Sequence, residues 1–218
     1  MPVFKLYPLF LAGMVTLLVG CQSAYFSAME KVGYHKRDIM VDRIESSQTA
    51  QEEAQTQFKS ALERFRHTVN FNGGDLEAVY NELNKEYERS VSAADNVRKR
   101  IDGVKSVSEA LFAEWRGELK QYTNQRLRDA SAKELKATER NYQQMLASLE
   151  KSEKQMQPIL NAFHDQVLYL KHNLNARAIS ALKGEFTSIK TDIERLIQAM
   201  QTSINQSKQF VKTLKKHK

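Results

Sequence analysis

The sequence is poor in the residues that interrupt helices or cross-link a fold. Its 218 residues include only three prolines, eight glycines, one tryptophan and one cysteine. A single cysteine excludes an intramolecular disulfide, so no framework of cross-links holds the chain. Proline and glycine are the residues that helix interiors tolerate least. Their scarcity, together with abundant Ala, Leu, Gln, Glu, Lys and Arg, predicts an almost wholly helical protein.

An uncharged, mainly apolar run follows Lys5 and extends to Gly20, and no acidic residue precedes Glu30. A basic start, an apolar run of this length and small residues at its end are typical of an export signal. The run is short for a membrane span, which needs roughly 20 apolar residues. We therefore predict a cleaved signal peptide at residues 1–20. An uncleaved inner-membrane anchor at residues 4–19 is the alternative.

The end of this segment, Leu18-Val19-Gly20-Cys21, resembles the bacterial lipobox. The resemblance implies cleavage between Gly20 and Cys21 and acylation of Cys21, where the only cysteine of the chain stands. Several acyl chains anchor a protein stably, whereas one chain binds only marginally. Gln22 replaces the Asp that resembles an inner-membrane retention signal, which favours the outer membrane, on its periplasmic side, over the inner membrane. Residues 21–36 form a short tether.

The net charge of +7 and the isoelectric point of about 9.4 are basic, but the two signs alternate along the chain. Nucleic acid is not an expected partner, because the chain is predicted to be exported and its aromatic residues do not stand among the basic ones. The compact basic feature is the C-terminal tail. Two interpretations stay open for it: contact with an anionic surface, such as lipid headgroups or a cell-wall polymer, or stabilisation of a helix C-terminus through its dipole. The tail comprises Lys208, Lys212, Lys215, Lys216 and Lys218.

Apolar periodicity predicts a first helix over residues 38–70. The middle of that helix, residues 46–57, has almost no large apolar side chain, and we expect it to be loosely held or exposed to solvent. The helix is expected to stop at Asn70-Phe-Asn-Gly-Gly-Asp75, where two glycines permit positive φ and Asp75 caps the next helix.

A sustained heptad pattern from Leu76 predicts a second helix that runs to about Arg128. We expect a bend or break near Gly103, which precedes a capping box at residues 106–109. A second capping box, Ser131-Ala-Lys-Glu134, is expected to open the third helix. Pro158 then predicts either a kink or a short connection with proline in the first turn of a new helix.

The chain is expected to reverse again at residues 173–176. The final helix carries the most regular heptad of the chain, with core positions that include Ser203 and Ser207. Such helices can bury their apolar stripes only against one another. We therefore predict an all-α fold: one domain, residues 37–218, built as an elongated antiparallel helical bundle with coiled-coil packing and three to four long helices.

No motif predicts a catalytic residue, a metal ligand or a bound cofactor. None of the five histidines has the spacing of a zinc site. The turn at residues 70–75 lacks the ligands of a calcium loop, and Gly73-Gly74 leads to no phosphate-binding lysine. We therefore expect a protein that is not an enzyme.

Four segments resemble one uncharacterised proteobacterial family of helical lipoproteins, domain of unknown function 2959. These segments are residues 30–43, Gly73-Gly-Asp-Leu76, Leu111-Phe-Ala-Glu-Trp115 and residues 165–176. The resemblance covers essentially the whole chain after the signal peptide. It implies a helical lipoprotein of the cell envelope, and it implies no activity, ligand or functional residue.

The expected function is that of a lipid-anchored helical scaffold or adaptor on the periplasmic side of the envelope. The membrane would be reached through the lipid on Cys21. An envelope protein or a second copy of the chain is the expected partner, and the polar middle of the first helix and the Trp115 region are the candidate contact surfaces. The alternative is a binding module whose groove between helices holds an acyl chain, a peptide or a cell-wall polymer.

Overall fold

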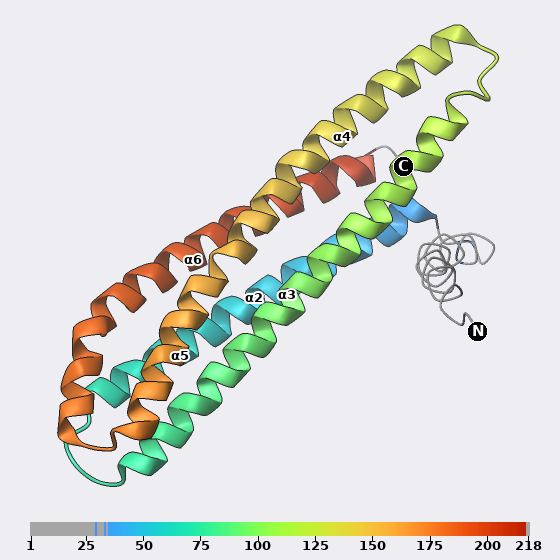
Figure 1. The fold of residues 1–218 in the computed structure, drawn as a ribbon. Helices are drawn as coiled ribbons and strands as arrows, with labels where there is room; N and C mark the ends of the chain where they lie inside the picture. Colours follow the sequence, from blue (N-terminus) through green and yellow to red (C-terminus); the bar gives the residue numbers. More distant parts are fainter. Residues whose placement is uncertain (1–28, 30–32, 34, 217–218) are drawn as a thin grey trace, which may run out of the picture. The chain divides into compact units, whose positions relative to one another are not determined.

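The computed structural model describes Met29, Gly33 and residues 35–216, and no strand occurs among them. Five helices follow one another in that part of the chain (Figure 1). They are α2 (Lys36–Val69), α3 (Leu76–Glu118), α4 (Gln125–Lys154), α5 (Met156–His172) and α6 (Ala176–Lys216). The predicted signal peptide, the lipidation site at Gly20 and Cys21, most of the tether and Lys218 lie outside the described residues.

The helices pack into two compact units, and several helices contribute to both. One unit combines the described residues up to Arg43 with Gly103–Glu139, and we call it the hairpin unit because its main part is the end of α3 and the beginning of α4. The other unit combines Ile44–Asp102 with Arg140–Lys218, and we call it the bundle unit. The predicted all-α antiparallel bundle is confirmed.

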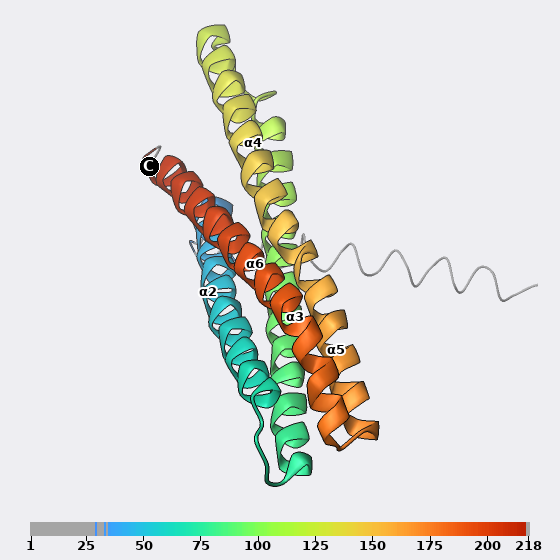
Figure 2. The same cartoon turned by 90° about the vertical axis from the view of Figure 1, so that its left-hand side faces the viewer.

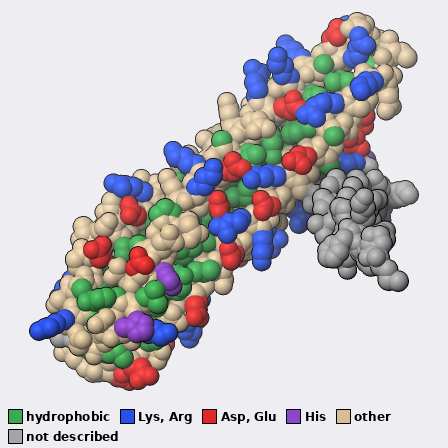
Figure 3. Space-filling view, viewed as in Figure 1, with side chains coloured by type: hydrophobic (Ala, Val, Ile, Leu, Met, Phe, Trp, Pro, Cys, Tyr) green, Lys and Arg blue, Asp and Glu red, His purple; other side chains and the backbone are tan. Residues whose placement is uncertain are grey.

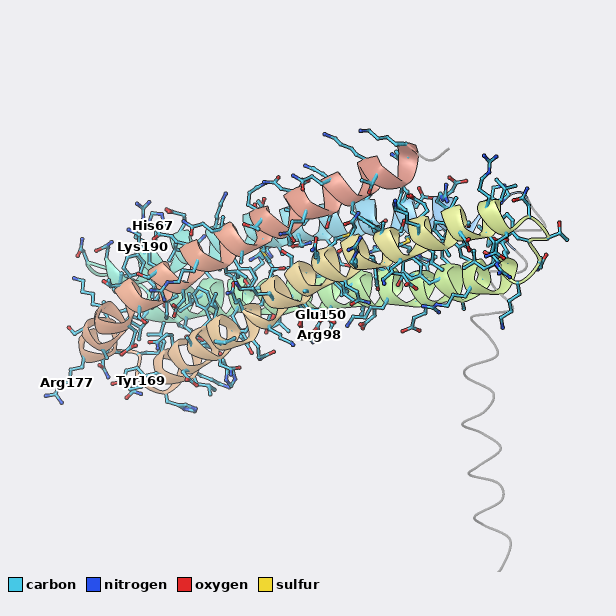
Figure 4. The ribbon with its side chains drawn as sticks, turned by 90° about the horizontal axis from the view of Figure 1, so that it is seen from above. His67, Arg98, Glu150, Tyr169, Arg177 and Lys190 are labelled. Carbon is cyan, nitrogen blue, oxygen red and sulfur yellow. The ribbon has the colours of Figure 1, made fainter. Side chains whose placement is uncertain are left out.

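In the bundle unit, contacts between side chains fix the direction of neighbouring helices. Arg64 of α2 pairs with Glu82 of α3 at 3.5 Å, close to the turn that joins the two helices. Figure 4 labels Arg98, a residue of α3 whose guanidinium pairs with Glu153 of α4 at 2.9 Å. Gln57 of α2 also donates a hydrogen bond to Glu86 of α3 at 2.8 Å. Residue numbers thus fall on α2, from Arg64 to Gln57, as they rise on α3, so α2 and α3 run antiparallel.

Heptad positions form the core of the bundle unit. Phe58, Phe65 and Phe163 are among its largest fully buried side chains. The Phe65 ring meets the Phe163 ring edge-on, with centroids 5.8 Å apart, and lies 5.7 Å from the Phe186 ring. Edge-to-face contacts of this kind add to the hydrophobic stabilisation of the core.

The turns of the bundle unit follow the sequence closely. Gly73 and Gly74 have φ of 132° and 122°, a region that other residues avoid. The Asp75 carboxylate accepts hydrogen bonds from the Glu77 and Ala78 amides at 2.9 and 3.2 Å, so Asp75 caps α3 as predicted. Asn175 caps α6 in the same way, at the predicted reversal.

Pro158 lies in the first turn of α5, which begins at Met156 directly after the end of α4 at Lys154. Of the two alternatives for this proline, the short connection is therefore correct. Helix α3, in contrast, continues through Gly103 without the expected break. The Arg43 side chain of α2 lies against Gly103, and a Cβ atom at that position would be in ordinary van der Waals contact with the Arg43 Cδ atom at 3.6 Å.

The predicted boundary between the second and third helices was wrong. Helix α3 ends at Glu118, and α4 begins at Gln125, upstream of the capping box at Ser131. The Asn124 side-chain oxygen caps α4, because it accepts a hydrogen bond from the Leu127 backbone amide at 3.2 Å. The heptad pattern continued through this region in the sequence, but Tyr122, one of its expected core positions, is 39% exposed. Without apolar burial, the Asn124 cap determines where the helix starts.

Candidate functional site

One face of the polar middle of α2 is buried, which corrects the expectation that this segment is loosely held or exposed to solvent. Steps of four and three residues from Met40 pass through Ile44, Ser47, Gln51 and Ala54, so the polar residues continue the buried stripe. Ser47 and Gln51 are 0% exposed. A polar side chain is buried at low cost only where it forms hydrogen bonds, and the facing helices supply partners.

Gln51 joins three helices of the bundle unit. Its side-chain oxygen accepts hydrogen bonds from Ser152 of α4, at 3.2 Å, and from Ser203 of α6. Each serine hydroxyl also lies within hydrogen-bond distance of a carbonyl of its own helix, Ser152 of Leu149 at 2.8 Å and Ser203 of Met200 at 3.2 Å, so its single hydrogen is shared between that carbonyl and Gln51. The amide and the two hydroxyls therefore form one network in the core.

Several polar atoms around this network are buried without a hydrogen-bond partner among the described residues. They are Ser47 Oγ, Gln48 Nε2, Gln51 Nε2, Gln155 Oε1, Gln206 Oε1 and Ser207 Oγ. On α2 and α6 these residues stand three or four positions from Gln51 or Ser203, and Gln155 stands three positions after Ser152. All six atoms therefore belong to residues within about one helical turn of the network. We call these residues, with Ser152 and Ser203, the polar layer. Its unused donors and acceptors would each be satisfied by water or by a ligand.

A groove between α4 and α6 adjoins the polar layer. It has a volume of about 570 Å³, and Gln206, a member of the polar layer, contributes to its wall. Its other amide side chains come from both helices, and its apolar base includes Phe210, whose ring lies 6.2 Å from that of Tyr142. We call it the amide groove, after Asn141, Gln144, Gln206 and Gln209.

In the bundle unit, helices α2 and α3 are joined by a charged network. Burial raises the pKa of the Glu86 carboxyl, but hydrogen bonds from Gln57, Ser60 and Arg89 and the Arg89 charge outweigh it, so the pKa of Glu86 lies below its ordinary value of 4.5. The donors lie 2.8, 3.1 and 2.8 Å from the carboxylate oxygens. Glu86 is thus held as a carboxylate at neutral pH, and its role is to bind α2 to α3.

The Trp115 region belongs to the hairpin unit. Lys36, the first residue of α2, is 9% exposed and pairs with Glu114 of α3 at 2.9 Å. The Arg37 guanidinium lies 5.8 Å from the centre of the Trp115 ring. The Trp115 indole donates a hydrogen bond to the Ser131 hydroxyl at 2.9 Å, so this serine holds α4 against α3 and does not cap a helix.

The basic tail is divided by the structure. Two lysines of α6 form ion pairs with α2: Lys208 pairs with Glu52 at 3.3 Å, and Lys215 pairs with Glu45 at 2.8 Å. Lys212 and Lys216 are exposed. Surface pairs of this kind contribute little stability individually, but they show that part of the tail has partners within the chain.

No group of three or more His, Cys, Asp or Glu side chains that could hold a metal ion occurs among the described residues. His164, one of the histidines considered in the sequence, packs against Tyr87 with ring centroids 5.4 Å apart. Figure 4 labels His67 of α2 and Lys190 of α6 on the same side of the bundle unit. Among the residues that the structure describes, no helix has the length and apolar character needed to cross a bilayer.

Residues 25–214 match the family described as protein of unknown function, DUF2959. The chain belongs to this family. The match covers all five described helices except the last residues of α6, so the resemblance stated from the four sequence segments is confirmed. Neither a curated protein nor a solved structure matches the chain.

The polar layer could have been found in the sequence. The last helix has Ser203 and Ser207 at heptad positions, and the stripe of the first helix passes through Ser47 and Gln51. Polar residues at core positions of two helices indicate a buried polar contact between them. Which residues would meet, and that Ser152 would join them, required the tertiary structure.

Proposed function

We propose that the protein is a lipid-anchored, non-enzymatic helical adaptor on the periplasmic side of the bacterial outer membrane, with Cys21 as its acylated residue. The lipobox supports the anchor and the compartment. The observation that carries the adaptor function is the amide groove beside the polar layer: four amide side chains from two helices line it, and a partner's backbone or polar side chains can pair with them. The groove would bind such a partner through hydrogen bonds from its amide side chains to the partner's amide and hydroxyl groups.

A partner bound in the amide groove would lie along α4 and α6. Gln144 and Gln209 would offer donors and acceptors from the two walls, and Phe210 would supply an apolar contact at the base. An extended peptide segment of an envelope protein suits this surface, because it presents backbone N–H and C=O groups at regular intervals. A second copy of the chain is the other protein that the surface would accept.

The second candidate function is a binding module for a free peptide or a cell-wall polymer. The same amide lining favours it, because sugars and peptides both offer the hydroxyl, carbonyl and N–H groups that amides bind. An acyl chain is the least suitable occupant. It would leave the amides of Gln206 and its neighbours without partners, and unpaired buried amides are costly.

The experiment that tests the proposal is photo-crosslinking in cells. A photoreactive amino acid replaces Gln209 in the amide groove, and a matched variant carries it at Gln201, an exposed glutamine of α6 outside the groove. We expect one envelope protein to be captured from position 209 and not from 201. Capture of glycan or free peptide from 209 would support the binding module. Equal capture from both positions would contradict a role for the groove.

A further inference from the structure

The hairpin unit ends in an exposed, basic and partly apolar tip. Every side chain from Lys120 to Ala130 is exposed. Within this tip, Tyr122 is 39% and Leu127 49% exposed, and both are large apolar side chains. The end of α3 and the beginning of α4 lie side by side here in Figures 1 and 2. We call residues 120–130 the hairpin tip.

The tip carries basic side chains next to its exposed apolar ones. Lys120, Arg126 and Arg128 stand within it, against a single acidic residue, Asp129. The Asp129 carboxylate accepts a hydrogen bond from Gln125 at 2.7 Å. Figure 3 shows Lys and Arg side chains gathered over this end of the hairpin unit. Aromatic and aliphatic groups beside cations are the combination that binds the surface of an anionic bilayer.

The contacts of the hairpin unit place the tip close to where the chain enters α2. The Lys36 ion pair holds the start of α2 against Glu114, which is the neighbour of Trp115. Ser131, the partner of the Trp115 indole, lies six residues after the start of α4. At 1.5 Å per residue, the first turns of α4 therefore extend about 9 Å beyond the level of Trp115, into the tip where α4 begins.

The tether that precedes α2 is short. From Gln22 to His35 it can span at most about 50 Å, at roughly 3.4 Å per residue. If Cys21 is acylated, the first residue of α2 lies within that distance of the bilayer. The tip then belongs to the part of the protein that is tied most closely to the membrane surface.

We propose that the hairpin tip binds the surface of the membrane in which the protein is anchored, through anionic lipid headgroups and shallow insertion of Tyr122 and Leu127. This inference rests on the proposed acylation of Cys21. It adds a second contact to the lipid anchor, and it fixes the orientation of the hairpin unit at the bilayer. Each basic residue near an anionic surface raises partitioning about fivefold, so Lys120, Arg126 and Arg128 together make a strong contribution.

A second exposed patch has similar chemistry and serves as the control. At the turn between α5 and α6, Leu168, Tyr169 and Leu174 are 41%, 43% and 44% exposed, with basic Lys171 and Arg177 nearby. This turn belongs to the bundle unit and not to the hairpin unit, which contains the start of α2. Composition alone would predict equal membrane contact for both patches, whereas the tether argument predicts contact for the tip.

The test uses the mature lipoprotein, reconstituted into vesicles of phosphatidylethanolamine and phosphatidylglycerol. Thr123→Cys in the tip and Leu174→Cys in the control patch are each labelled with an environment-sensitive fluorophore, and acylated Cys21 offers no competing thiol. We expect a blue shift at position 123 and quenching by lipids with brominated acyl chains at least about threefold stronger than at position 174. Equal emission and quenching at the two positions would overturn the inference.

The charge contribution is tested in the same vesicles. Lys120→Glu combined with Arg126→Glu should reduce quenching at position 123 to the level of the control, and replacement of phosphatidylglycerol by phosphatidylcholine should do the same. Circular dichroism checks that the variant is folded, which is expected because both side chains are exposed. Unchanged quenching in either arm would contradict recognition of anionic lipid.

Failure of the anchor can be told apart from failure of the tip. The mass of the N-terminal peptide reports the acyl chains on Cys21. If the protein is acylated and bound to vesicles but the label at position 123 remains in water, the proposed membrane contact of the tip is wrong and the lipid anchor is not affected. An unmodified Cys21 overturns the anchor, and with it the argument that brings the tip to the membrane.

Discussion

At the scale of single residues, Glu86 shows how a carboxylate can be buried at the contact of two helices. It is 6% exposed, and Gln57, Ser60 and Arg89 donate hydrogen bonds to its oxygens. The donors favour the charged form more strongly than burial opposes it, which lowers its pKa in the folded state. The contact between α2 and α3 therefore depends on a carboxylate that stays ionised.

The consequence is a stability that depends on pH below 4.5. A group with a lowered folded-state pKa contributes stability that is fully present above its unfolded pKa and is lost as the pH falls through the folded value. We expect the free energy of unfolding to decline on acidification below pH 4.5, and Glu86→Gln to show a shallower decline. Urea unfolding between pH 3 and 7 measures both. Parallel curves for the two proteins would mean that Glu86 is not the group responsible.

At the scale of secondary structure elements, the polar layer joins α2, α4 and α6. The Gln51 side-chain oxygen has partners on both other helices, but its Nε2 group has none among the described residues. The two serines retain backbone acceptors within their own helices. The layer therefore contains a buried donor whose removal would leave its neighbours satisfied.

We expect Gln51→Leu to raise the free energy of unfolding by about 1 kcal/mol, because a leucine of similar volume removes an unpaired buried amide. Urea denaturation measures the change. Gln201→Leu, on an exposed face of α6, is the matched control and should change stability by less than about 0.5 kcal/mol. A loss of stability in Gln51→Leu would indicate instead that the amide is bound to ordered water in the core.

At the scale of the whole molecule, membrane attachment is proposed to depend on one residue, Cys21. We expect a Cys21→Ser chain, exported with an ordinary cleavable signal peptide, to move from the membrane fraction to the soluble periplasmic fraction after a high-salt wash. The wash removes electrostatic contacts such as those proposed for the hairpin tip. Fractionation followed by immunoblotting measures the distribution.

The natural chain, with its own N-terminus, is the control for that experiment. Its mature N-terminal peptide should begin at an acylated Cys21. Complete retention of the Cys21→Ser chain in membranes would contradict the lipid anchor. Detection of residues 4–19 in the natural mature protein would instead support the uncleaved anchor at the inner membrane.

The sequence alone determined the helical class, the antiparallel bundle and most of its turns, because these depend on local chemistry. Heptad spacing predicts which face of a helix is buried, the pair Gly73-Gly74 permits a turn, and Asp75 caps the helix that follows it. The family resemblance was also readable at this level. The one wrong helix boundary, between α3 and α4, arose because a heptad pattern says nothing about whether another helix is present to cover it.

Only the tertiary structure decided which polar residues are buried and which exposed residues lie together. Gln51 belongs to a segment that was expected to be loosely held or exposed to solvent, and it is buried where Ser152 and Ser203, distant in sequence, meet its side chain. The two walls of the amide groove come from α4 and α6, and the pairing of Lys36 with Glu114 holds the start of α2 in the unit that carries the hairpin tip. These features depend on long-range pairing and on the desolvation that accompanies it, which no local pattern records.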